Sequence, residues 1–336
     1  MSKVINAAVA GLGRIGWRHV ADILKTEGLG IGALCEPNAE LAEKAKAEFN
    51  IPVYQSYDEM LEKSASDFVV IATPSHMHFE MASKALKKGF NVLVEKPVTP
   101  NAGEAKELKS VAENAGRWIS VNQSFRYRPD VAYIKDIIKS GLIGELFQIH
   151  IYIPGNFSER SDWQIWKKFD GGALANWGVH LVDAVLFMSE QNPTDVFAKL
   201  DRVLDKGDAE DSFKVMFKMD KGCTAEVEAA KSFFNKTHWH VCGTKGSIIG
   251  EFDPVPVMKI KAQYVVDGKT ETKSESFDFA QPQYSSLMIP HYAEIAKNLK
   301  EGKEPPVTID SVIKTMSVLD AARESSASGQ SIRIIS

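Results

Sequence analysis

The sequence predicts an α/β protein in which a parallel sheet is followed by a mixed or antiparallel one. At about 150 residues per domain, a chain of 336 residues corresponds to roughly two domains. Short apolar runs alternate with helical patterns in the first third, and alternating apolar and polar positions separated by turns follow later. With 44% hydrophobic and 25% charged residues, the composition is typical of a globular chain and excludes wholesale disorder.

The first third of the chain alternates strands with helices. Its expected strands are residues 7–10, 31–35, 68–72, 91–94 and 118–121, and its expected helices are residues 15–24, 39–49, 77–87 and 102–115. Strands this apolar, separated by helices, indicate a parallel sheet that is covered on both faces. We place the first domain at residues 1–124.

The pattern changes after residue 124, and residues 125–336 are expected to form the second domain. The expected helices are residues 129–140, 173–188, 285–300 and 310–325, and the expected strands include residues 146–153, 212–219 and 332–335. Turns at residues 220–222 and 267–268 are typical of hairpins. Gly178 costs about 1 kcal/mol relative to alanine, which weakens the continuity of the second helix. The last helices can pack back on the first domain.

Charge and cysteine content exclude several functions. The net charge is −4, and no basic block is present that would follow a nucleic-acid backbone. Cys35, Cys223 and Cys242 form no CxxC pair, which argues against a disulfide framework or zinc site and favours reduced, buried thiols. No apolar run approaches the roughly 20 residues of a membrane helix, and the N-terminus lacks a signal-peptide pattern. We therefore expect a cytoplasmic protein without a membrane partner.

A glycine-rich motif follows the first expected strand. Gly11, Gly13 and Gly16 fit GxGxxG, with Arg14 and Ile15 between the last two glycines. The first glycine makes the turn, the second lets the backbone approach a pyrophosphate, and the third lets helix and strand pack closely. This context predicts a dinucleotide site, whereas the motif alone would also fit an ordinary glycine-rich turn.

Glu36 lies twenty residues after the last glycine, directly after the second expected strand. A carboxylate at this place accepts hydrogen bonds from the adenosine ribose hydroxyls and repels a 2′-phosphate. Residues 37–41 contain no arginine or lysine that would receive such a phosphate. The sequence therefore predicts NAD as the cofactor, with NADP disfavoured.

Several motifs in order along the chain resemble the Gfo/Idh/MocA oxidoreductases, the family of glucose-fructose oxidoreductase and inositol dehydrogenase. They are GxGxxG at 11–16, Thr73-Pro74 with His78, Glu95-Lys96-Pro97, and the segment from Gly171-Gly172 to His180 and Asp183. The resemblance implies a Rossmann domain followed by an α/β domain with a large open, mostly antiparallel sheet. It also implies a homodimer or homotetramer, and hydride transfer between nicotinamide and a secondary alcohol of a sugar or polyol bound between the domains.

The same resemblance implies two catalytic residues, Lys96 and His180. An ammonium beside the reacting carbon would stabilise developing alkoxide charge, although a lysine after a strand is ordinarily just solvated. The pKa of histidine near 6.5 suits a general base in oxidation and a general acid in reduction. The helical spacing places Asn176, His180 and Asp183 on one face, so a core histidine satisfied by Asp183 is the plainer alternative.

The sequence departs from the commonest family pattern at Asn176, where the family usually has aspartate. An amide donates and accepts hydrogen bonds but takes no proton. We therefore assign Asn176 and Asp183 to substrate binding and leave proton transfer to His180.

Other candidate residues are placed by the same resemblance. Those expected near the cofactor are Thr73, Pro74, Ser75, His78 and Glu95, and those expected near the substrate are Asn122, Arg126, Tyr127 and Trp163. Trp163, with Trp166 and Trp177, is suggested by its position around the double glycine, and only one of the three is expected to touch the substrate. Plainer roles compete: His78 as a helix start, Arg126 in a surface ion pair, and the tryptophans as core residues. The acidic residues 205–211 fit a solvated loop.

His238 and His240 flank Trp239 on one face of an expected strand. No third ligand is in register, so we expect a sheet face or an oligomer interface and no metal site. Two other functions compete with a dehydrogenase: redox-neutral glycoside cleavage through a transient ketone, and dinucleotide sensing without catalysis. The presence of both Lys96 and His180 disfavours the second.

Overall fold

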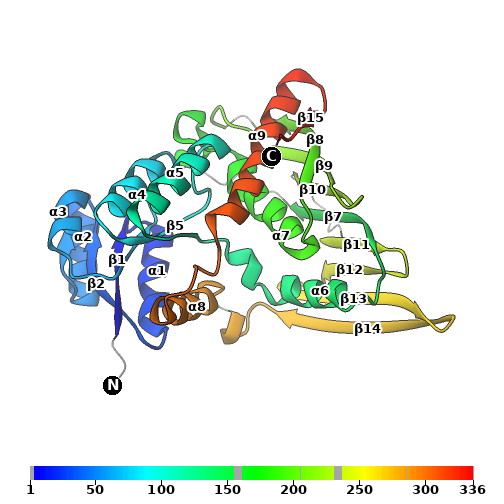
Figure 1. The fold of residues 1–336 in the computed structure, drawn as a ribbon, viewed down its shortest axis with the longest axis horizontal. Coiled ribbons are helices and arrows are strands. Elements are labelled where there is room, and N and C mark those ends of the chain that lie inside the picture. Colours follow the sequence, from blue (N-terminus) through cyan, green and yellow to red (C-terminus); the bar gives the residue numbers. More distant parts are fainter. Residues whose placement is uncertain (1–3, 155–160, 205, 231–236, 285, 336) are drawn as a thin grey trace. The chain divides into compact units, whose positions relative to one another are not determined.

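The structure is a computed structural model that describes residues 4–154, 161–204, 206–230, 237–284 and 286–335 (Figure 1). It contains two compact units. The first unit comprises residues 1–123 and 286–313, and the second comprises residues 124–285 and 314–336. Relative to the expected division after residue 124, the difference is that residues 286–313 belong to the first unit.

The first unit contains a six-stranded parallel sheet in the order β3-β2-β1-β4-β5-β6. Its strands are β1 Ile5–Ala10, β2 Leu29–Cys35, β3 Val53–Tyr54, β4 Phe68–Ile71, β5 Asn91–Val94 and β6 Ile119–Val121. The order reverses between β1 and β4, and ligands of open α/β sheets bind at the carboxyl ends of the strands around such a reversal. The predicted parallel sheet is confirmed.

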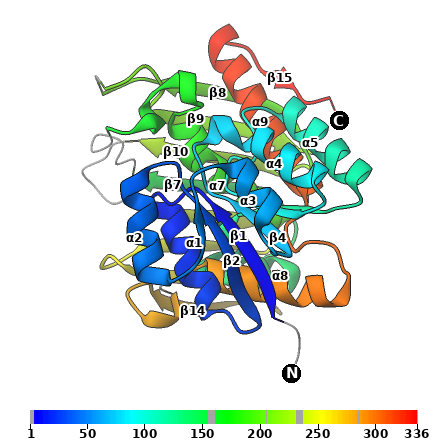
Figure 2. The same cartoon turned by 90° about the vertical axis from the view of Figure 1, so that its left-hand side faces the viewer.

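Helices cover both faces of this sheet. They are α1 Arg14–Lys25, α2 Ala39–Phe49, α3 Tyr57–Lys63, α4 His78–Lys87 and α5 Ala102–Ala115. Figure 2 shows α1 and α2 on one side of β1 and β2, with α3 and α4 on the other. The bounds of α2 and α5 match the expected ones because each begins at an asparagine cap, Asn38 or Asn101, and ends at a left-handed residue.

The short elements β3 and α3 escaped the sequence analysis. A strand of two residues and a helix of seven show too little periodicity to stand out. One local signal was present, because the Ser56 side chain caps α3 by accepting a hydrogen bond from the backbone of Glu59.

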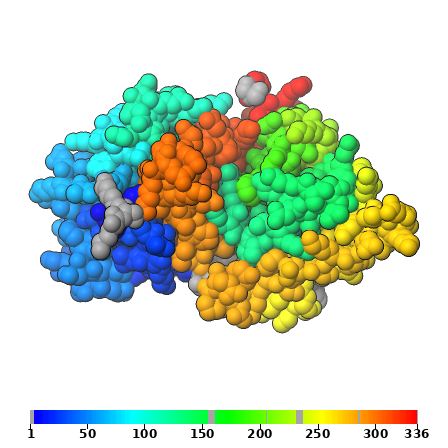
Figure 3. Space-filling model, turned by 60° about the horizontal axis from the view of Figure 1, so that its bottom comes forward, coloured from blue at the N-terminus to red at the C-terminus, as the bar shows by residue number. Residues whose placement is uncertain are grey.

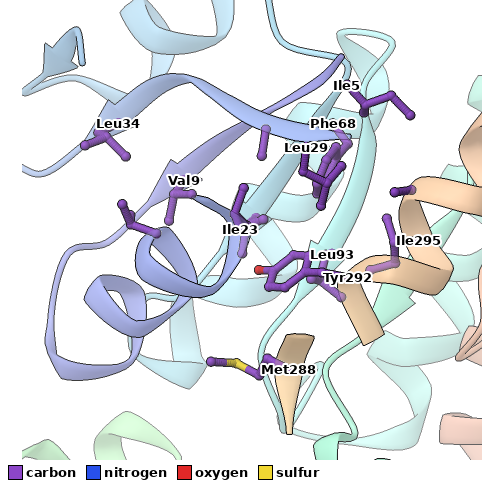
Figure 4. Close-up of a cluster of buried hydrophobic side chains, with 14 of the residues drawn as sticks. Ile5, Val9, Ile23, Leu29, Leu34, Phe68, Leu93, Met288, Tyr292 and Ile295 are labelled. Carbon is purple, nitrogen blue, oxygen red and sulfur yellow. The ribbon is translucent and has the colours of Figure 1, made fainter. Parts of the chain in front are cut away.

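Helix α8, Met288–Glu301, completes the core of the first unit although it lies late in the sequence. Figure 4 shows its side chains among those of four strands and α1; the labelled residues are Ile5, Val9, Ile23, Leu29, Leu34, Phe68, Leu93, Met288, Tyr292 and Ile295. In Figure 3 the orange atoms of this segment lie directly against the blue and cyan atoms of the same unit. α8 thus covers the α1 side of the sheet.

The second unit contains a nine-stranded sheet in the order β14-β13-β12-β11-β7-β10-β9-β8-β15. Its strands are β7 Leu146–Pro154, β8 Pro193–Asp201, β9 Ser212–Met219, β10 Thr224–Ala230, β11 Trp239–Gly243, β12 Gly246–Phe252, β13 Val257–Val266, β14 Lys269–Asp278 and β15 Ile332–Arg333. β7 and β10 pair in parallel, while the other neighbours pair antiparallel. The predicted mostly antiparallel sheet is confirmed.

Helices pack on one face of this sheet. They are α6 Pro129–Lys139, α7 Val179–Ser189 and the larger part of α9, which spans Ile309–Ser328. Burial along β9 follows the strand period, since Phe213, Val215 and Phe217 are buried while Lys214 and Met216 are exposed. The face that carries the exposed positions is open within this unit.

The expected helix at residues 173–188 begins differently from the prediction. Residues Leu174–Gly178 form a wide π-helical turn, and the regular helix α7 begins at Val179. By length and composition the stretch Lys167–Ser189 would be able to cross a membrane, yet most of it is buried in the second unit, as in a core helix.

Candidate active site

The glycine-rich turn of the first unit tolerates no side chain at two positions. Gly11 has a φ of +86°, and a Cβ there would lie 2.8 Å from the carbonyl oxygen of Ala72. A Cβ at Gly16 would lie 1.8 Å from the carbonyl oxygen of Gly11, so α1 packs directly on the turn. These contacts explain the spacing of the motif.

Gly13 leaves the start of α1 open. It is the N-cap of α1, and a Cβ there would meet none of the described atoms within 4 Å. Exposed Arg14 and half-buried Ile15 follow in the first turn. A helix N-terminus carries unpaired N–H groups and a partial positive charge, so this opening fits the pyrophosphate of a dinucleotide.

Glu36 is held against this turn. Its Oε2 accepts a hydrogen bond from the backbone N–H of Leu12 at 2.8 Å, and its Oε1 accepts one from Asn38 at 3.0 Å. The residue is only 8% exposed. The carboxylate therefore has a fixed place between β2 and the glycine-rich turn.

The loops after β4 and β5 are joined through His78. Its Nδ1 lies 2.7 Å from the carbonyl oxygen of Pro97, and its Nε2 lies 2.9 Å from that of Thr73. Burial lowers the pKa of His78. His78 is the first residue of α4, and its ring nitrogens face these carbonyls, which is the geometry of the plainer role at a helix start; its contact with a cofactor stays a prediction. Pro74 and Ser75 lie in the loop that it fixes.

Glu95 points into the first unit. Its Oε1 accepts hydrogen bonds from His19 Nε2 at 2.9 Å and Asn122 Nδ2 at 2.6 Å, and its Oε2 accepts one from the backbone N–H of Lys96 at 3.1 Å. Burial alone would raise the pKa of Glu95, but the hydrogen bond and the electrostatic attraction of His19, followed by the Lys96 charge and the Asn122 hydrogen bond, hold it at about 2. The structure thus places Glu95 and Asn122 in a buried network beside half-buried Lys96.

In the second unit, His180 lies in the first turn of α7. It is 7% exposed, and its ring stacks on Phe125 with centroids 4.4 Å apart and an interplanar angle of 13°. Trp177 approaches it edge-on at 6.4 Å. Asn176, in the π-helical turn, donates from Nδ2 to Gln164 Oε1 at 3.3 Å. The aromatic contacts fix the plane of the imidazole.

Arg126 and Asp183 form a buried ion pair in the same unit. Arg126 Nε and Nη2 donate to the two oxygens of Asp183 at 2.8 and 2.7 Å, and Thr315 Oγ1 donates to Oδ1 at 3.2 Å. Both oxygens of Asp183 are therefore engaged by groups other than His180. The pair, expected among substrate-binding residues, ties residues 124–127 to α7.

The double glycine fits a crowded loop. A Cβ at Gly171 would lie 2.3 Å from the carbonyl oxygen of Gln164, and Gly172 has a φ of +116° beside the Glu210 carboxylate. Glu210 Oε1 accepts from the backbone N–H of Leu174 at 3.0 Å, and burial raises the pKa of Glu210. The prediction of a solvated acidic loop is wrong for Glu210 and for buried Asp211, because both accept backbone hydrogen bonds.

The aromatic candidates differ in exposure. Trp163 and Trp177 are half-buried, as is Tyr127, while Trp166 is 40% exposed. Trp163 begins a 3₁₀ turn at Trp163–Ile165, which precedes the double glycine. Trp163 and Tyr127 are both partly exposed, so their contact with a substrate stays a prediction.

The two histidines beside Trp239 differ in burial: His238 is buried and His240 is half-buried. His238 is buried against aromatic rings, and burial lowers its pKa to about 3. His240 faces His150 across β11 and β7. His150 also belongs to a group with metal-ligand spacing, which it forms with Glu226 and Glu228. It is the one such group among the described residues. Lys214 forms ion pairs with both carboxylates at 2.9 and 3.4 Å, so it compensates one of their two negative charges.

His19, Tyr292 and His291 were not singled out from the sequence. His19 carried a local signal, because it lies with Val20 and Ile23 on the buried side of α1, where a polar residue needs a partner. The α8 residues carried none, since Tyr292 is 273 positions from His19.

The open start of α1 behind a glycine turn, with Glu36 at the end of β2, defines the first unit as a Rossmann dinucleotide-binding domain. The comparisons with known proteins agree. Residues 5–123 match the family model described as oxidoreductase family, NAD-binding Rossmann fold, and residues 131–249 match the GFO/IDH/MocA C-terminal domain. The chain belongs to the Gfo/Idh/MocA family of oxidoreductases.

Relatives with assigned activities include both cofactor types. The scyllo-inositol 2-dehydrogenase (NAD(+)) of Bacillus subtilis is 27% identical and covers 99% of this chain and 97% of its own. The NADP(+) enzyme of the same name and organism is 25% identical, covering 87% and 86%. An uncharacterized oxidoreductase of Schizosaccharomyces pombe is 34% identical over 52% of this chain. The matched region spans about half of that relative, 48% of its length.

Solved structures agree on the fold. The NAD-binding protein from Listeria innocua superimposes with a TM-score of 0.85 at 27% identity, covering 98% of this chain and 97% of its own.

Proposed function

We propose that the protein is an NAD(H)-dependent dehydrogenase acting on a secondary alcohol, or the corresponding ketone, of a sugar, sugar derivative or cyclic polyol. The observation that carries this proposal is the glycine-rich turn with an open helix N-terminus and the fixed carboxylate of Glu36 beside it. The names of the inositol dehydrogenases among its relatives support the substrate class.

NAD is the proposed cofactor rather than NADP. Glu36 is buried and fixed by Leu12 and Asn38, so it is poorly placed to move aside for a 2′-phosphate. Residues 37–41 supply no cation to balance such a phosphate. Nicotinamide, when bound, accepts or returns the hydride.

Lys96 and His180 are the proposed catalytic residues, each argued within its own unit. The Lys96 ammonium would stabilise negative charge on the reacting oxygen. His180, held flat against Phe125, would take the hydroxyl proton in oxidation and return it in reduction. The Asn176 amide would orient the substrate by hydrogen bonds, with Trp163 and Tyr127 offering apolar faces to a sugar ring.

The open face of the nine-stranded sheet is the proposed contact in a homodimer or homotetramer. Phe197 and Met216 lie opposite each other on β8 and β9 and are 46% and 43% exposed, and Ile249 on β12 is 38% exposed. Covering these side chains would remove apolar surface from water. Light scattering of the purified chain measures its oligomeric state.

We also place the protein in the cytoplasm, in keeping with its free cysteines, of which Cys35 and Cys223 are buried.

A substrate screen tests the activity. Aldoses, inositols, amino sugars and glycosides are incubated with the protein and NAD⁺ while NADH absorbance is followed, and the products are analysed by mass spectrometry. We expect NADH with a product two mass units lighter than the substrate. Glycoside cleavage without net NADH would replace this proposal with redox-neutral cleavage, and cofactor binding without any turnover would favour a sensing role.

A further inference from the structure

Glu95 is a buried carboxylate whose hydrogen-bond partners come from three parts of the first unit. Its donors are His19 of α1, Asn122 after β6, and the backbone of Lys96. A buried charge without partners is strongly unfavourable, so these donors are what allows an ionised carboxylate at this position. Their arrangement needs an explanation beyond packing, because a neutral side chain would avoid the cost.

Each side-chain donor is held in turn by a neighbouring residue of α8. Tyr292 places its hydroxyl at hydrogen-bonding distance from His19 Nδ1, and His291 Nδ1 lies 3.2 Å from Asn122 Oδ1. Figure 4 shows Tyr292 reaching from α8 toward α1 between Ile23 and Leu93. The helix that returns late in the sequence therefore contacts both side-chain donors of Glu95.

We assign the direction of the hydrogen bonds starting from the phenol of Tyr292, which can donate its proton. Burial, followed by the charges of Glu95 and Asp22, raises the pKa of Tyr292 well above its ordinary value, so the hydroxyl keeps its proton. We assign that proton to His19 Nδ1 as acceptor, which leaves the N–H on Nε2, facing Glu95. The chain of donors then runs from Tyr292 through His19 to the carboxylate, and every proton has an acceptor.

We propose that His19, Tyr292, Asn122 and His291 are positioning residues that hold the Glu95 carboxylate beside Lys96, where it keeps the lysine protonated and its backbone in place. A nearby anion favours the charged form of an amine and so raises its pKa. The charged or titratable groups around Glu95 are Lys96, His19 on α1, His78 on α4, and Tyr292 and His291 on α8. The importance of this arrangement for catalysis rests on the proposed function, whereas the arrangement itself lies within one unit.

The first test measures Lys96 directly, without substrate or cofactor. The intact protein is labelled with a trace of acetic anhydride over a range of pH, and mass spectrometry gives the apparent pKa of Lys96 with exposed Lys87 as internal reference. We expect the pKa of wild-type Lys96 at or above that of Lys87. Glu95→Gln keeps the shape but removes the charge, so we expect the pKa of Lys96 to fall by about one unit, or about tenfold faster labelling near pH 8.

The second test addresses the donors through stability. The pKa of Glu95 is about 2 in the folded protein against an ordinary 4.5, so its ionisation stabilises the fold above pH 4.5 and that contribution is lost as the pH falls toward 2. Tyr292→Phe removes the hydroxyl that contacts His19 and should raise the pKa of Glu95. Between pH 4.5 and 2, the variant should therefore lose the stabilising contribution of Glu95 at a higher pH than the wild type does. Tyr57→Phe is the matched control, because its hydroxyl donates to the Met81 carbonyl elsewhere in the unit.

The outcomes separate this inference from the proposed function. An unchanged pKa of Lys96 in folded Glu95→Gln overturns the inference. If that variant does not fold, a pKa of wild-type Lys96 below that of Lys87 overturns it, as does a Tyr292→Phe profile identical to that of Tyr57→Phe. If the expected shifts appear while the substrate screen finds no turnover, the inference stands and the proposed dehydrogenase activity fails.

Discussion

The Glu36 carboxylate is hydrogen-bonded to the backbone N–H of Leu12 at 2.8 Å, which ties the end of β2 to the glycine-rich turn. In the proposed function this bond joins the turn assigned to the pyrophosphate and the carboxylate assigned to the ribose. The proposed preference for NAD therefore depends on one hydrogen-bonded piece of the first unit.

We expect NADH to bind more tightly than NADPH, because Glu36 opposes a 2′-phosphate and is held in place by hydrogen bonds from Leu12 and Asn38. Glu36→Gln should narrow the difference between the two cofactors, since it removes the repulsion. Glu40→Gln, an exposed carboxylate on α2, is the control and should leave both affinities unchanged. Calorimetric titration of the wild type and both variants with each cofactor measures these affinities; NADPH binding as tight as NADH in the wild type contradicts the assignment.

Lys96→Ala should reduce turnover by about 10² to 10³, the usual loss when an electrostatic group at a reacting oxygen is removed. Cofactor affinity should change far less. Steady-state kinetics on the substrate found in the screen, together with calorimetry, measures the two effects, and Lys87→Ala serves as a surface control. Near wild-type turnover, with chemistry shown to be rate-limiting, would remove Lys96 from the proposed role.

The pH dependence of kcat/KM should contain one ionisation that belongs to His180. It should vanish in His180→Ala and persist in Asn176→Ala, which should chiefly weaken substrate binding. Asn176→Asp adds a carboxylate four residues from His180, which favours imidazolium and should raise the apparent pKa. Solvent and substrate isotope effects show that chemistry is observed. Survival of the ionisation in His180→Ala would assign the proton to another group.

Breaking the Arg126–Asp183 pair should be strongly destabilising. Asp183→Asn leaves a buried guanidinium without its counter-charge, so the free energy of unfolding should fall by about 3 to 5 kcal/mol. Glu59→Gln removes the exposed pair of Lys63 and Glu59 and should cost about 0.5 kcal/mol or less. Urea denaturation measures both. A loss below about 1 kcal/mol for Asp183→Asn would mean that the pair contributes no more than a surface one.

Much of the first unit could be predicted because its signals are local. The glycine spacing, the apolar strands and the asparagine caps each depend on residues within a few positions, and the corresponding strands and helices appear where expected. The spacing of Glu36 after the glycines rests on the same local pattern, and the structure places its carboxylate against the glycine-rich turn. Local pattern also predicted the helix around His180, although the wide turn at Leu174–Gly178 was not foreseen.

Partnerships between distant residues could be decided only by the tertiary structure. Arg126 meets Asp183 across 57 positions and His19 meets Tyr292 across 273, and no periodicity in the chain encodes either choice. The order of the nine strands and the return of α8 to the first unit belong to the same class. The physical reason is that a short segment sets its own backbone conformation and buried face, whereas the partner that covers that face, and the charge that balances a buried one, come from whichever segments the whole chain packs together.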